Sequence, residues 1–444
     1  MTFPSLTDQP GALETASLIR EGRLSPSEAT DRAIARIEAR DGPINAVVVR
    51  AFDRARDTAK AMDRQTPLPH QTLFGVPLTI KESFDVAGLP TCWGLKDHAG
   101  RIAQADAAVV RQLKAAGAVL LGKTNVPPGL ADWQSFNPLH GRTRNPHDVD
   151  RSAGGSSGGA AAAVASGMVA AEFGTDIGGS VRVPAHFCGI WGHKPSWGLV
   201  SSEGHTDPAF ADRGRHDGAL NVAGPLARNA ADLAAMLELT ATIPLLRRDK
   251  SLETMRFLAL LDHPASPIDD DVRQPIEAAL DVLRGVGASV DVGYTDLPDL
   301  AGDHAAYLKM LNITMARGAP SPGGHQASAA DWFDLMDAQV RCERSWARLF
   351  ESYDFVLAPP ANILAFPHRN EPLFRGKIAI NGEERDAAEG LAWAGIATFP
   401  NLPATVLPVG ASGDLPCGMQ VIGPRWSDFD CIAAAEAIGA RLHG

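Results

Sequence analysis

The sequence lacks the cysteine pattern of a disulfide-stabilised protein. Its five cysteines are an odd number without close pairs: Cys92, Cys188, Cys342, Cys417 and Cys431. Neither a disulfide framework nor a zinc site is therefore indicated. The first residues, MTFP, also lack the basic region and the long apolar core with which a signal peptide begins. Together these two absences predict a protein of the reducing cytoplasm.

Long apolar runs and an excess of positive charge are missing as well. The apolar stretch around residues 160–171 is shorter than a membrane span and is predicted to be a core helix rich in alanine and glycine. With 41 basic and 52 acidic residues, the chain of 444 residues carries a formal charge of −11, which disfavours nucleic acid and anionic membranes as partners. There is no internal repeat or low-complexity tract. What remains is a globular chain large enough to bury a deep core and a closed pocket.

Two glycine-serine clusters lie between residues 151 and 195. The first, GGSSGG at 154–159, runs into an alanine-rich segment, and it is predicted to be a tight loop that opens a closely packed helix. Backbone N–H groups and the positive end of the helix dipole would gather beside its two serines. It is not a phosphate-binding P-loop, because no Gly-Lys-Ser/Thr closes the motif, and flexible linkers are not followed by a dense helix.

The second cluster places two glycines before Ser180, in the segment GTDIGGSVRVP at 174–184. Such glycines let the backbone turn sharply and point consecutive N–H groups toward one bound atom, as in an oxyanion hole. A serine hydroxyl is a weak nucleophile until a base takes its proton. The motif GVPLTIKES at 75–83 places Lys81 at the rim of a short buried strand. Burial would lower the pKa of this lysine and make it a candidate general base.

These motifs together resemble those of the amidase signature family of serine hydrolases. The resemblance covers most of the chain and includes GVPLTIKES, LLGKTNVPP at 120–128, WQSFNP at 133–138, both glycine-serine clusters and LPCGMQVIGP at 415–424. The chain departs from many relatives at 192–197, where GHKPSW stands in place of Gly-Leu-Lys-Pro-Thr. That departure affects expectations about the substrate more than those about the chemistry.

The resemblance implies a Ser-cisSer-Lys triad. Ser180 would be the acylated nucleophile, Ser156 the bridging serine after a cis peptide bond from Gly155, and Lys81 the terminal base. The spacing of the two serines matches that of the family. The oxyanion would be held by the backbone N–H groups of Ile177, Gly178, Gly179 and Ser180. Hydrogen bonds that support the triad would come from Ser157, Thr175, Asp176 and Arg182.

The resemblance also implies an α/β fold in a single large domain, with a mixed, twisted β-sheet flanked by helices on both faces. Length alone would suggest two or three domains. The expected amidase domain spans 1–444. Its parts are an N-terminal helical region at 1–65, a catalytic core at 66–240, a variable or lid region at 241–340 and a C-terminal completion of the core at 341–444. Within the lid region, the loop from Arg317 to Gly324 is expected to differ between relatives of different specificity.

Local patterns predict helices and strands in alternation, which is typical of an α/β layer structure. Residues 11–62 look helical, with a capping box at Ser25 and Glu28 and a proline in the first turn. Further helices are predicted at 106–116, 270–283 and 431–442. Strands are predicted at 118–121, 256–261, 288–292, 355–360, 404–408 and 418–423. A proline is expected to end the strands at 355–360 and 404–408.

The turn-rich segment from Pro127 to Pro146 is expected to form a wall of the active site. The apolar side chains predicted to line the substrate pocket are Leu130, Trp133, Phe136 and Trp191. The alternative for each is an ordinary core or loop-anchoring residue. His186 and His193 would suggest a serine–histidine mechanism, but the resemblance assigns the base to lysine, so both are predicted to be structural.

The expected activity is hydrolysis of a carboxylic amide C–N bond through a covalent acyl-serine, giving a carboxylate and ammonia or an amine, with esterase activity as a side reaction. One alternative is the glutaminase subunit of a tRNA-dependent amidotransferase, which would need partner subunits. Val183, where that subunit type carries glutamine, argues against it. A second alternative is an inactive binding protein on an amidase scaffold, against which the intact triad argues.

No metal and no organic cofactor are expected, and the partner is a small-molecule amide. The fold and the triad determine the reaction but not the side groups of the substrate, so the particular amide stays open. The aromatic residues predicted for the pocket favour an apolar acyl or aryl group. The sequence is silent on oligomeric state, for which a homodimer is the default expectation.

Overall fold

The computed structural model describes residues 9–213, 218–248, 250–293, 296–317, 319–320, 324 and 326–443. The helices are α1 Ala12–Arg20, α2 Pro26–Ile44, α3 Phe52–Met62, α4 Ala108–Ala115, α5 Gly158–Ala165, α6 Arg182–Cys188, α7 Ala230–Thr240, α8 Asp270–Gly285, α9 Leu300–Ala316, α10 Ala329–Ser352, α11 Leu391–Thr398 and α12 Asp428–His443. The strands are β1 Val47–Arg50, β2 Pro77–Lys81, β3 Val119–Thr124, β4 Phe136–Asn137, β5 Gly141–Arg142, β6 Ala171–Asp176, β7 Trp191–Lys194, β8 Val222–Ala227, β9 Arg256–Ala259, β10 Ser289–Val292, β11 Phe355–Ala358, β12 Lys377–Ile380, β13 Glu383–Asp386, β14 Ala404–Ser412 and β15 Leu415–Ile422.

A mixed eight-stranded sheet forms the centre of the fold, with the strand order β10-β9-β11-β15-β14-β7-β8-β6. Strands β10, β9 and β11 are parallel, and each neighbouring pair from β11 to β6 is antiparallel. A smaller sheet, β1-β3-β2, lies next to the large one, because β2 packs beside β6. The ends of β2 and β6 therefore come close together, which matters for the site described below.

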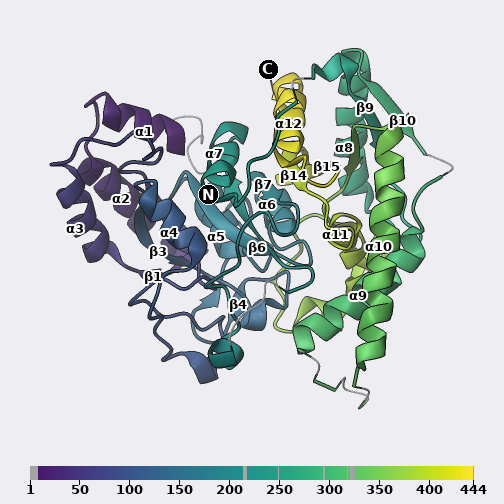
Figure 1. Ribbon diagram of the computed structural model, residues 1–444, viewed down its shortest axis with the longest axis horizontal. Coiled ribbons are helices and arrows are strands. Elements are labelled where there is room, and N and C mark those ends of the chain that lie inside the picture. Colours follow the sequence, from purple (N-terminus) through teal and green to yellow (C-terminus); the bar gives the residue numbers. More distant parts are fainter. Residues whose placement is uncertain are drawn as a thin grey trace.

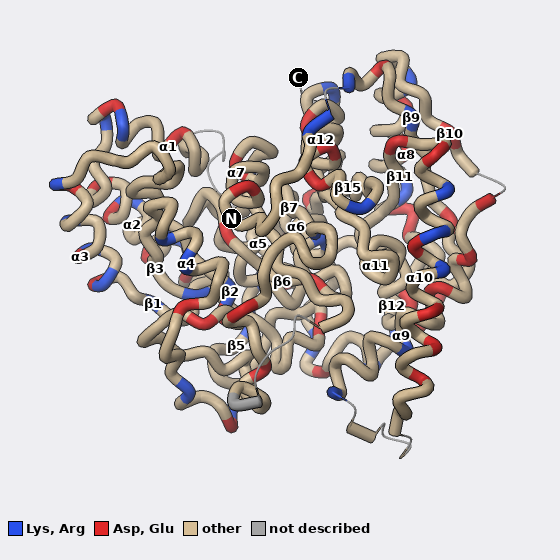
Figure 2. The backbone as a smooth tube through the Cα atoms, viewed as in Figure 1, with Lys and Arg blue, Asp and Glu red and all other residues tan. Residues whose placement is uncertain are grey.

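Helices cover both faces of the large sheet, as the sequence predicted. On one face α12 packs between α7 and α8, and on the other α5 packs against α6. In Figure 1, helices α1 to α4 lie at one end of the molecule and the long helices α9 and α10 at the other, where β9 and β10 of the large sheet also lie. Charged residues gather on these outer helices (Figure 2), whereas α5 carries none and is buried along its whole length. The chain thus forms a single α/β domain.

The N-terminal region confirms one local prediction and corrects another. Ser25 caps α2 as predicted: the backbone N–H of Glu28 donates to Ser25 Oγ at 3.1 Å, and the Glu28 carboxylate accepts from the Ser25 N–H. The prediction of helix throughout 11–62 is wrong at 47–50. There Asn45 ends α2 in a left-handed conformation, and the β-branched residues that follow form β1, which pairs antiparallel with β3.

In the C-terminal part, β11 and β15 lie where the sequence predicted strands, but β14 does not end at Pro408. Strand β7 pairs with β14 only from Ala404 to Val406, so Pro408 lies beyond that ladder and pairs with Gly418 of β15. A shift in register after Pro408 lets the pairing with β15 continue to Ser412. Of the loop predicted at 317–324, residues 318 and 321–323 lie outside the described residues.

Among the helices of the described ranges, none combines the length and the apolar character needed to cross a membrane.

Candidate active site

The side chain of Lys81 is completely buried at the point where β2 ends. Its Nζ atom lies 2.7 Å from Ser156 Oγ, 2.9 Å from Ser157 Oγ and 2.8 Å from Thr175 Oγ1. The two serines belong to the first glycine-serine cluster, and Thr175 stands near the end of β6, next to β2. All hydrogen-bond partners of this amine among the described residues are uncharged hydroxyl or carbonyl oxygens. The fold thus surrounds one buried amine with three hydroxyl groups.

The buried position of Lys81 changes its protonation. Burial lowers its pKa to about 7, because the ammonium form loses its hydration. The negative charge of Asp176 opposes this shift, and so does that of Glu172 when this carboxyl is ionised. Burial raises the pKa of Glu172 to about 8, so near neutral pH this carboxyl, 2.6 Å from Thr124 Oγ1, is mostly protonated. Burial alone would also raise the pKa of Asp176, but the positive charge of Arg182 outweighs it and brings the pKa to about 2. Near neutral pH the Lys81 amine can therefore exist in its neutral form, which an exposed lysine rarely does.

Ser156 reaches Lys81 from the loop that precedes α5. The peptide bond between Gly155 and Ser156 is cis, which confirms the geometry implied by the resemblance. A side chain at Gly155 would place its Cβ 2.3 Å from the backbone oxygen of Asp132, and one at Gly159 would lie 2.3 Å from the backbone nitrogen of Asn125. The glycines of the first cluster are thus required because the loop and α5 pack directly against the backbone of the segment 125–132.

The second glycine-serine cluster is held by its carbonyl groups. Tyr307 Oη donates to the carbonyl oxygen of Ile177 at 2.8 Å, and Trp133 Nε1 donates to that of Gly178 at 2.8 Å. Because the C=O and N–H of a trans peptide point in opposite directions, the Gly178 N–H is turned away from Tyr307. The Gly179 N–H donates to Asp176 Oδ1 at 3.0 Å. This donor is already engaged, which reduces the predicted oxyanion hole to Ile177, Gly178 and Ser180.

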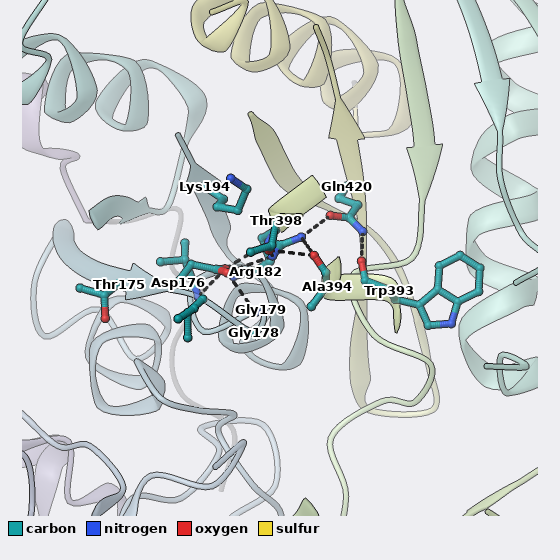
Figure 3. A network of polar contacts seen from close by, with 12 residues as sticks. Thr175, Asp176, Gly178, Gly179, Arg182, Lys194, Trp393, Ala394, Thr398 and Gln420 are labelled. Atoms are coloured by element: carbon teal, nitrogen blue, oxygen red, sulfur yellow. Dashed lines mark hydrogen bonds and ion pairs between the residues drawn. The ribbon is translucent and has the colours of Figure 1, made fainter. Parts of the chain in front are cut away.

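A buried ion pair connects this cluster to the core. Arg182 Nη2 lies 2.9 Å from Asp176 Oδ1 and Arg182 Nε lies 3.1 Å from Oδ2, with both side chains completely buried. The guanidinium also donates to the Ala394 carbonyl, to Gln420 Oε1 and to Thr398 Oγ1, at 3.0, 3.1 and 2.8 Å. Figure 3 shows how groups from β6, α11 and β15 converge on Arg182 at the start of α6. These contacts fix the carboxylate of Asp176, which in turn holds the second glycine-serine cluster by accepting a hydrogen bond from the Gly179 N–H.

A cavity of about 760 Å³ contains the side chains of both serines. On one side it is lined by Ser156, Thr175, Ile177 and Ser180. The remaining walls are mixed: apolar and aromatic residues lie beside polar and charged ones. The first group includes Trp93, Leu130, His205, Phe210, Ile313 and Trp332, and the second includes Ser202, Asp207, Asn221, Thr314 and Arg317. These walls come from segments far apart in the chain, since Trp332 belongs to α10 and Ile313 to α9. A small organic molecule would fit into a cavity of this size with one part against the two serines.

Of the four predicted pocket residues, Leu130 lines this cavity and the other three do not. Trp133 lies behind the second glycine-serine cluster and binds its backbone. Phe136 stands under the guanidinium of Arg142, 4.6 Å from its centre, and Trp191 of β7 packs against Gly439 of α12. The prediction fails for these residues because an apolar side chain indicates burial but not the wall on which it lies. Sequence reasoning missed Trp93, His205, Phe210, Ile313 and Trp332, for which no local motif gave a signal.

The two histidines near Ser180 in sequence have structural roles, as predicted. The ring of His186 is bound on both sides, with Nε2 3.1 Å from the Ile363 carbonyl and Nδ1 accepting from the Gly418 N–H at 2.7 Å. His193 lies between Thr405 Oγ1 and Asp428 Oδ1, at 2.8 and 3.1 Å. Burial lowers the pKa of both rings, that of His186 to about 4. Both are buried and committed to the core, so neither is available to serve Ser180 as a base.

Comparison with known proteins identifies the family. The family model "Amidase" matches residues 28–292 and 303–432, and the chain belongs to this family, whose members hydrolyse amide C–N bonds. A putative amidase, AmiB2 of Mycobacterium tuberculosis, is 42% identical over 96% of this chain and 95% of its own length. Indoleacetamide hydrolase of Bradyrhizobium diazoefficiens is 32% identical, over 97% of this chain and 86% of its own. The crystal structure of a bacterial aryl acylamidase of the amidase signature family superposes with a TM-score of 0.81 at 28% identity, covering 97% of this chain and 96% of the other. The chain is therefore an amidase, a hydrolase of carbon–nitrogen bonds other than peptide bonds.

Proposed function

We propose that this amidase hydrolyses a small-molecule amide through Ser180, with Ser156 and Lys81 as the proton relay. The observation that carries the proposal is the buried amine of Lys81, which lies 2.7 Å from Ser156 Oγ, while Ser156 and Ser180 line the same cavity. A buried amine with a pKa of about 7 is a competent base at neutral pH, which an exposed lysine is not. Ser157 and Thr175 hold the amine in place through its other two hydroxyl contacts.

In the proposed reaction, neutral Lys81 accepts the proton of Ser156 while Ser156 accepts that of Ser180. The Ser180 oxygen attacks the amide carbonyl carbon, and the carbonyl oxygen becomes an oxyanion. When this intermediate collapses, the C–N bond breaks and the leaving nitrogen receives the proton back along the relay. Water then attacks the acyl-Ser180 ester through the same relay, releasing the carboxylate and restoring the serine. An ester substrate fits the same steps, so esterase side activity is part of the proposal.

The oxyanion would be held by the backbone N–H groups of Ile177, Gly178 and Ser180. Each such donor contributes about 3 kcal/mol to transition-state stabilisation when it is fixed before the reaction. The support for this role is the hydrogen bond from Tyr307 to the Ile177 carbonyl, which fixes the peptide group that carries the Gly178 N–H. The hydrogen bond from Trp133 to the Gly178 carbonyl fixes the next peptide group and so keeps the turn in shape. Asp176 and Arg182 would act as positioning residues that keep this turn in shape.

Two features favour a small-molecule amidase over the glutaminase subunit of an amidotransferase. The relatives named above, which match nearly the whole chain, are amidases. The cavity wall also contains polar side chains, but its aromatic ones, Trp93, Phe210 and Trp332, give an aryl amide a contact surface that the side chain of glutamine would not use. All five cysteines are buried free thiols, which is compatible with the cytoplasmic location that we propose.

The experiment that tests the proposal traps the acyl-enzyme. Purified protein is mixed with an excess of an anilide, quenched in acid during turnover, digested and examined by mass spectrometry. We expect the mass of the acyl group on the peptide that contains Ser180. An acyl group on Ser156 or Ser157 would contradict the assignment of the nucleophile, and turnover without any acylated serine would contradict the covalent mechanism.

The pH dependence of the reaction should report the protonation of Lys81. Because its neutral form is the base and its pKa is about 7, kcat/KM for an uncharged amide should rise about tenfold per pH unit below pH 7 and level off above it. Steady-state rates between pH 5.5 and 9, with circular dichroism to show that the protein stays folded, measure this profile.

A second buried lysine provides the control for this profile. Burial also lowers the pKa of Lys194 to about 7, but its Nζ donates to the carbonyl oxygen of Pro195 and not to the serines. The variant Lys194→Met should therefore keep the inflection near pH 7. A profile that is flat across this range in the wild type, or an inflection that disappears in Lys194→Met, would assign the base to another group.

A further inference from the structure

The backbone of Trp93 has an unusual conformation in the wall of the cavity. Its φ angle is 53°, in the left-handed region that bulky residues rarely adopt. Leu130, which lines the same cavity, also has a left-handed φ of 61°. The two residues pack in one small apolar cluster, and the N–H of Gly129 donates to the Trp93 carbonyl at 2.9 Å. Strained residues of this kind persist where the surroundings hold them, and they gather at functional sites.

The carboxylate of Glu82 holds Trp93 in this conformation. Its two oxygens accept hydrogen bonds from consecutive backbone N–H groups, Oε1 from Cys92 at 2.6 Å and Oε2 from Trp93 at 2.9 Å. The indole Nε1 of Trp93 donates in turn to the Ser83 carbonyl at 3.0 Å. Glu82 is buried and directly follows Lys81, so the end of β2 fixes both the buried amine and this wall of the cavity.

The loop that carries Trp93 is anchored on its other side by a buried lysine. Lys123 Nζ donates to Thr91 Oγ1 at 2.7 Å and also to the carbonyl of Pro90. Its positive charge lies near the carboxylate of Glu82 and lowers the cost of burying it. Because both sides of the loop are tied to the core, the indole has little freedom to move aside for a bulky group.

The Trp93 indole belongs to a series of packed rings that extends from the core to the cavity. The ring of His205 lies 4.7 Å from that of Trp93, with an angle of 31° between the planes. Phe84 follows behind His205 at 5.3 Å, and Phe173 lies 6.4 Å from Phe84 in the core. Trp93 and His205 line the cavity, whereas Phe84 and Phe173 are completely buried behind them. This part of the wall is therefore aromatic and rigid.

We propose that Trp93 is a specificity-determining residue that selects amides carrying a planar aromatic ring, and that Glu82 is the positioning residue that holds it. The inference rests on the proposed function, since it names the substrate class of the same site. A fixed aromatic surface accepts a flat ring in stacked or edge contact, but it gives a saturated ring of the same size poorer contact. Such a contact between rings is worth about 3- to 10-fold beyond the area buried.

The test compares planar and saturated rings of matched size. The substrate pairs are benzamide with cyclohexanecarboxamide and acetanilide with N-cyclohexylacetamide, which also show whether the acyl or the amine side carries the ring. In the wild type we expect kcat/KM to favour the planar member of at least one pair by about 10-fold. In Trp93→Leu this preference should fall below about 3-fold, mainly through KM, and Trp93→Phe should restore part of it. Glu82→Gln, which keeps only one of the two acceptor oxygens, should also lower the preference for the planar substrate, as Trp93→Leu does.

The matched control is Trp426→Leu. Trp426 also has a left-handed φ, of 71°, but it is 37% exposed and does not line the cavity. This variant should keep the planar preference of the wild type. An unchanged preference in Trp93→Leu and Trp93→Phe, or an equal loss for planar and saturated members, would overturn the inference.

A binding measurement separates this inference from the proposed mechanism. Dissociation constants for benzamide and cyclohexanecarboxamide are measured by calorimetry on Ser180→Ala protein, with and without Trp93→Leu. If loss of the indole weakens the binding of benzamide but not that of cyclohexanecarboxamide, the inference is supported even if no amide is hydrolysed. Equal effects on the two ligands overturn it. Failure of the wild type to hydrolyse any amide would contradict the proposed function and leave this comparison valid.

Discussion

Replacement of Ser180 by alanine is expected to lower kcat at least about a thousandfold, because the variant has no oxygen to form the acyl-enzyme. The relay would still be assembled, since Lys81 keeps its 2.7 Å contact with Ser156, but it would have no nucleophile to activate. The residual rate would come from the oxyanion donors and from substrate binding alone. Steady-state rates of anilide hydrolysis, measured as the release of aniline, give the loss of kcat.

The fold should tolerate this change. The Ser180 side chain is 5% exposed at the cavity, and its removal leaves the backbone hydrogen bond from the Ser157 N–H to the Ser180 carbonyl in place. Stability is expected to stay within about 0.5 kcal/mol of the wild type. Ser166→Ala is the matched control: that serine, which caps the end of α5, is also buried, but its hydroxyl donates to the Ala162 carbonyl, and the variant should keep its rate. Activity in Ser180→Ala above about a thousandth of the wild type would reject Ser180 as the nucleophile.

The grouping of Ser156, Ser157 and Thr175 around the buried Lys81 could be expected from the sequence because short motifs carry these residues. The glycines at 155 and 159 are required by backbone contacts closer than any Cβ would allow, so their positions could be recognised without a structure. The same holds for Lys81, which follows a short apolar strand and is therefore buried. The fold class also followed from the motifs, since the matched segments are distributed over most of the chain. For these features, the local residue patterns and the family resemblance led to the same expectation.

The walls of the cavity could not be predicted in the same way. Trp93, Ile313 and Trp332 come from three distant segments that only the tertiary fold brings together. An apolar side chain in a loop is expected to be buried, but the sequence does not say in which direction it points. That direction depends on contacts such as those of Glu82 with the backbone N–H groups of residues 92 and 93. Phe136 and Trp191 were misplaced for this reason. The oxyanion hole shows the same limit, because the engagement of Gly179 by Asp176 is a property of the folded turn.

The errors in secondary structure have local causes. The three valines of β1 belong to a short strand at the edge of the small sheet, and partner β3 lies more than sixty residues away, so nothing in the helical segments around them signals the pairing. Pro408 was expected to end a strand, but it lies beyond the ladder with β7, and the pairing with β15 continues past it after a shift in register. In both cases the partner strand, and not the intrinsic preference of the residues, determines the outcome.

Replacement of Arg182 by methionine is expected to destabilise the protein by about 3–5 kcal/mol, because it leaves the carboxylate of Asp176 buried without its counter-charge. The hydrogen-bond acceptors on Ala394, Thr398 and Gln420 would lose their donor as well. For a chain of this length the melting temperature should fall by roughly 3–5 °C. Thermal and urea unfolding, each followed by two spectroscopic probes, measure the change.

The double variant Asp176→Asn/Arg182→Met separates the loss of charge balance from the loss of packing. Asparagine keeps an acceptor for the Gly179 N–H but carries no charge, so the double variant should be more stable than Arg182→Met alone. Because Asp176 holds the turn that would bind the oxyanion, Arg182→Met should also lower kcat by about tenfold or more, with a smaller change in KM. A cost below about 1 kcal/mol, or a double variant less stable than the single one, would show that the ion pair does not hold this turn. If stability falls but kcat does not, the network stabilises the core without positioning the oxyanion donors.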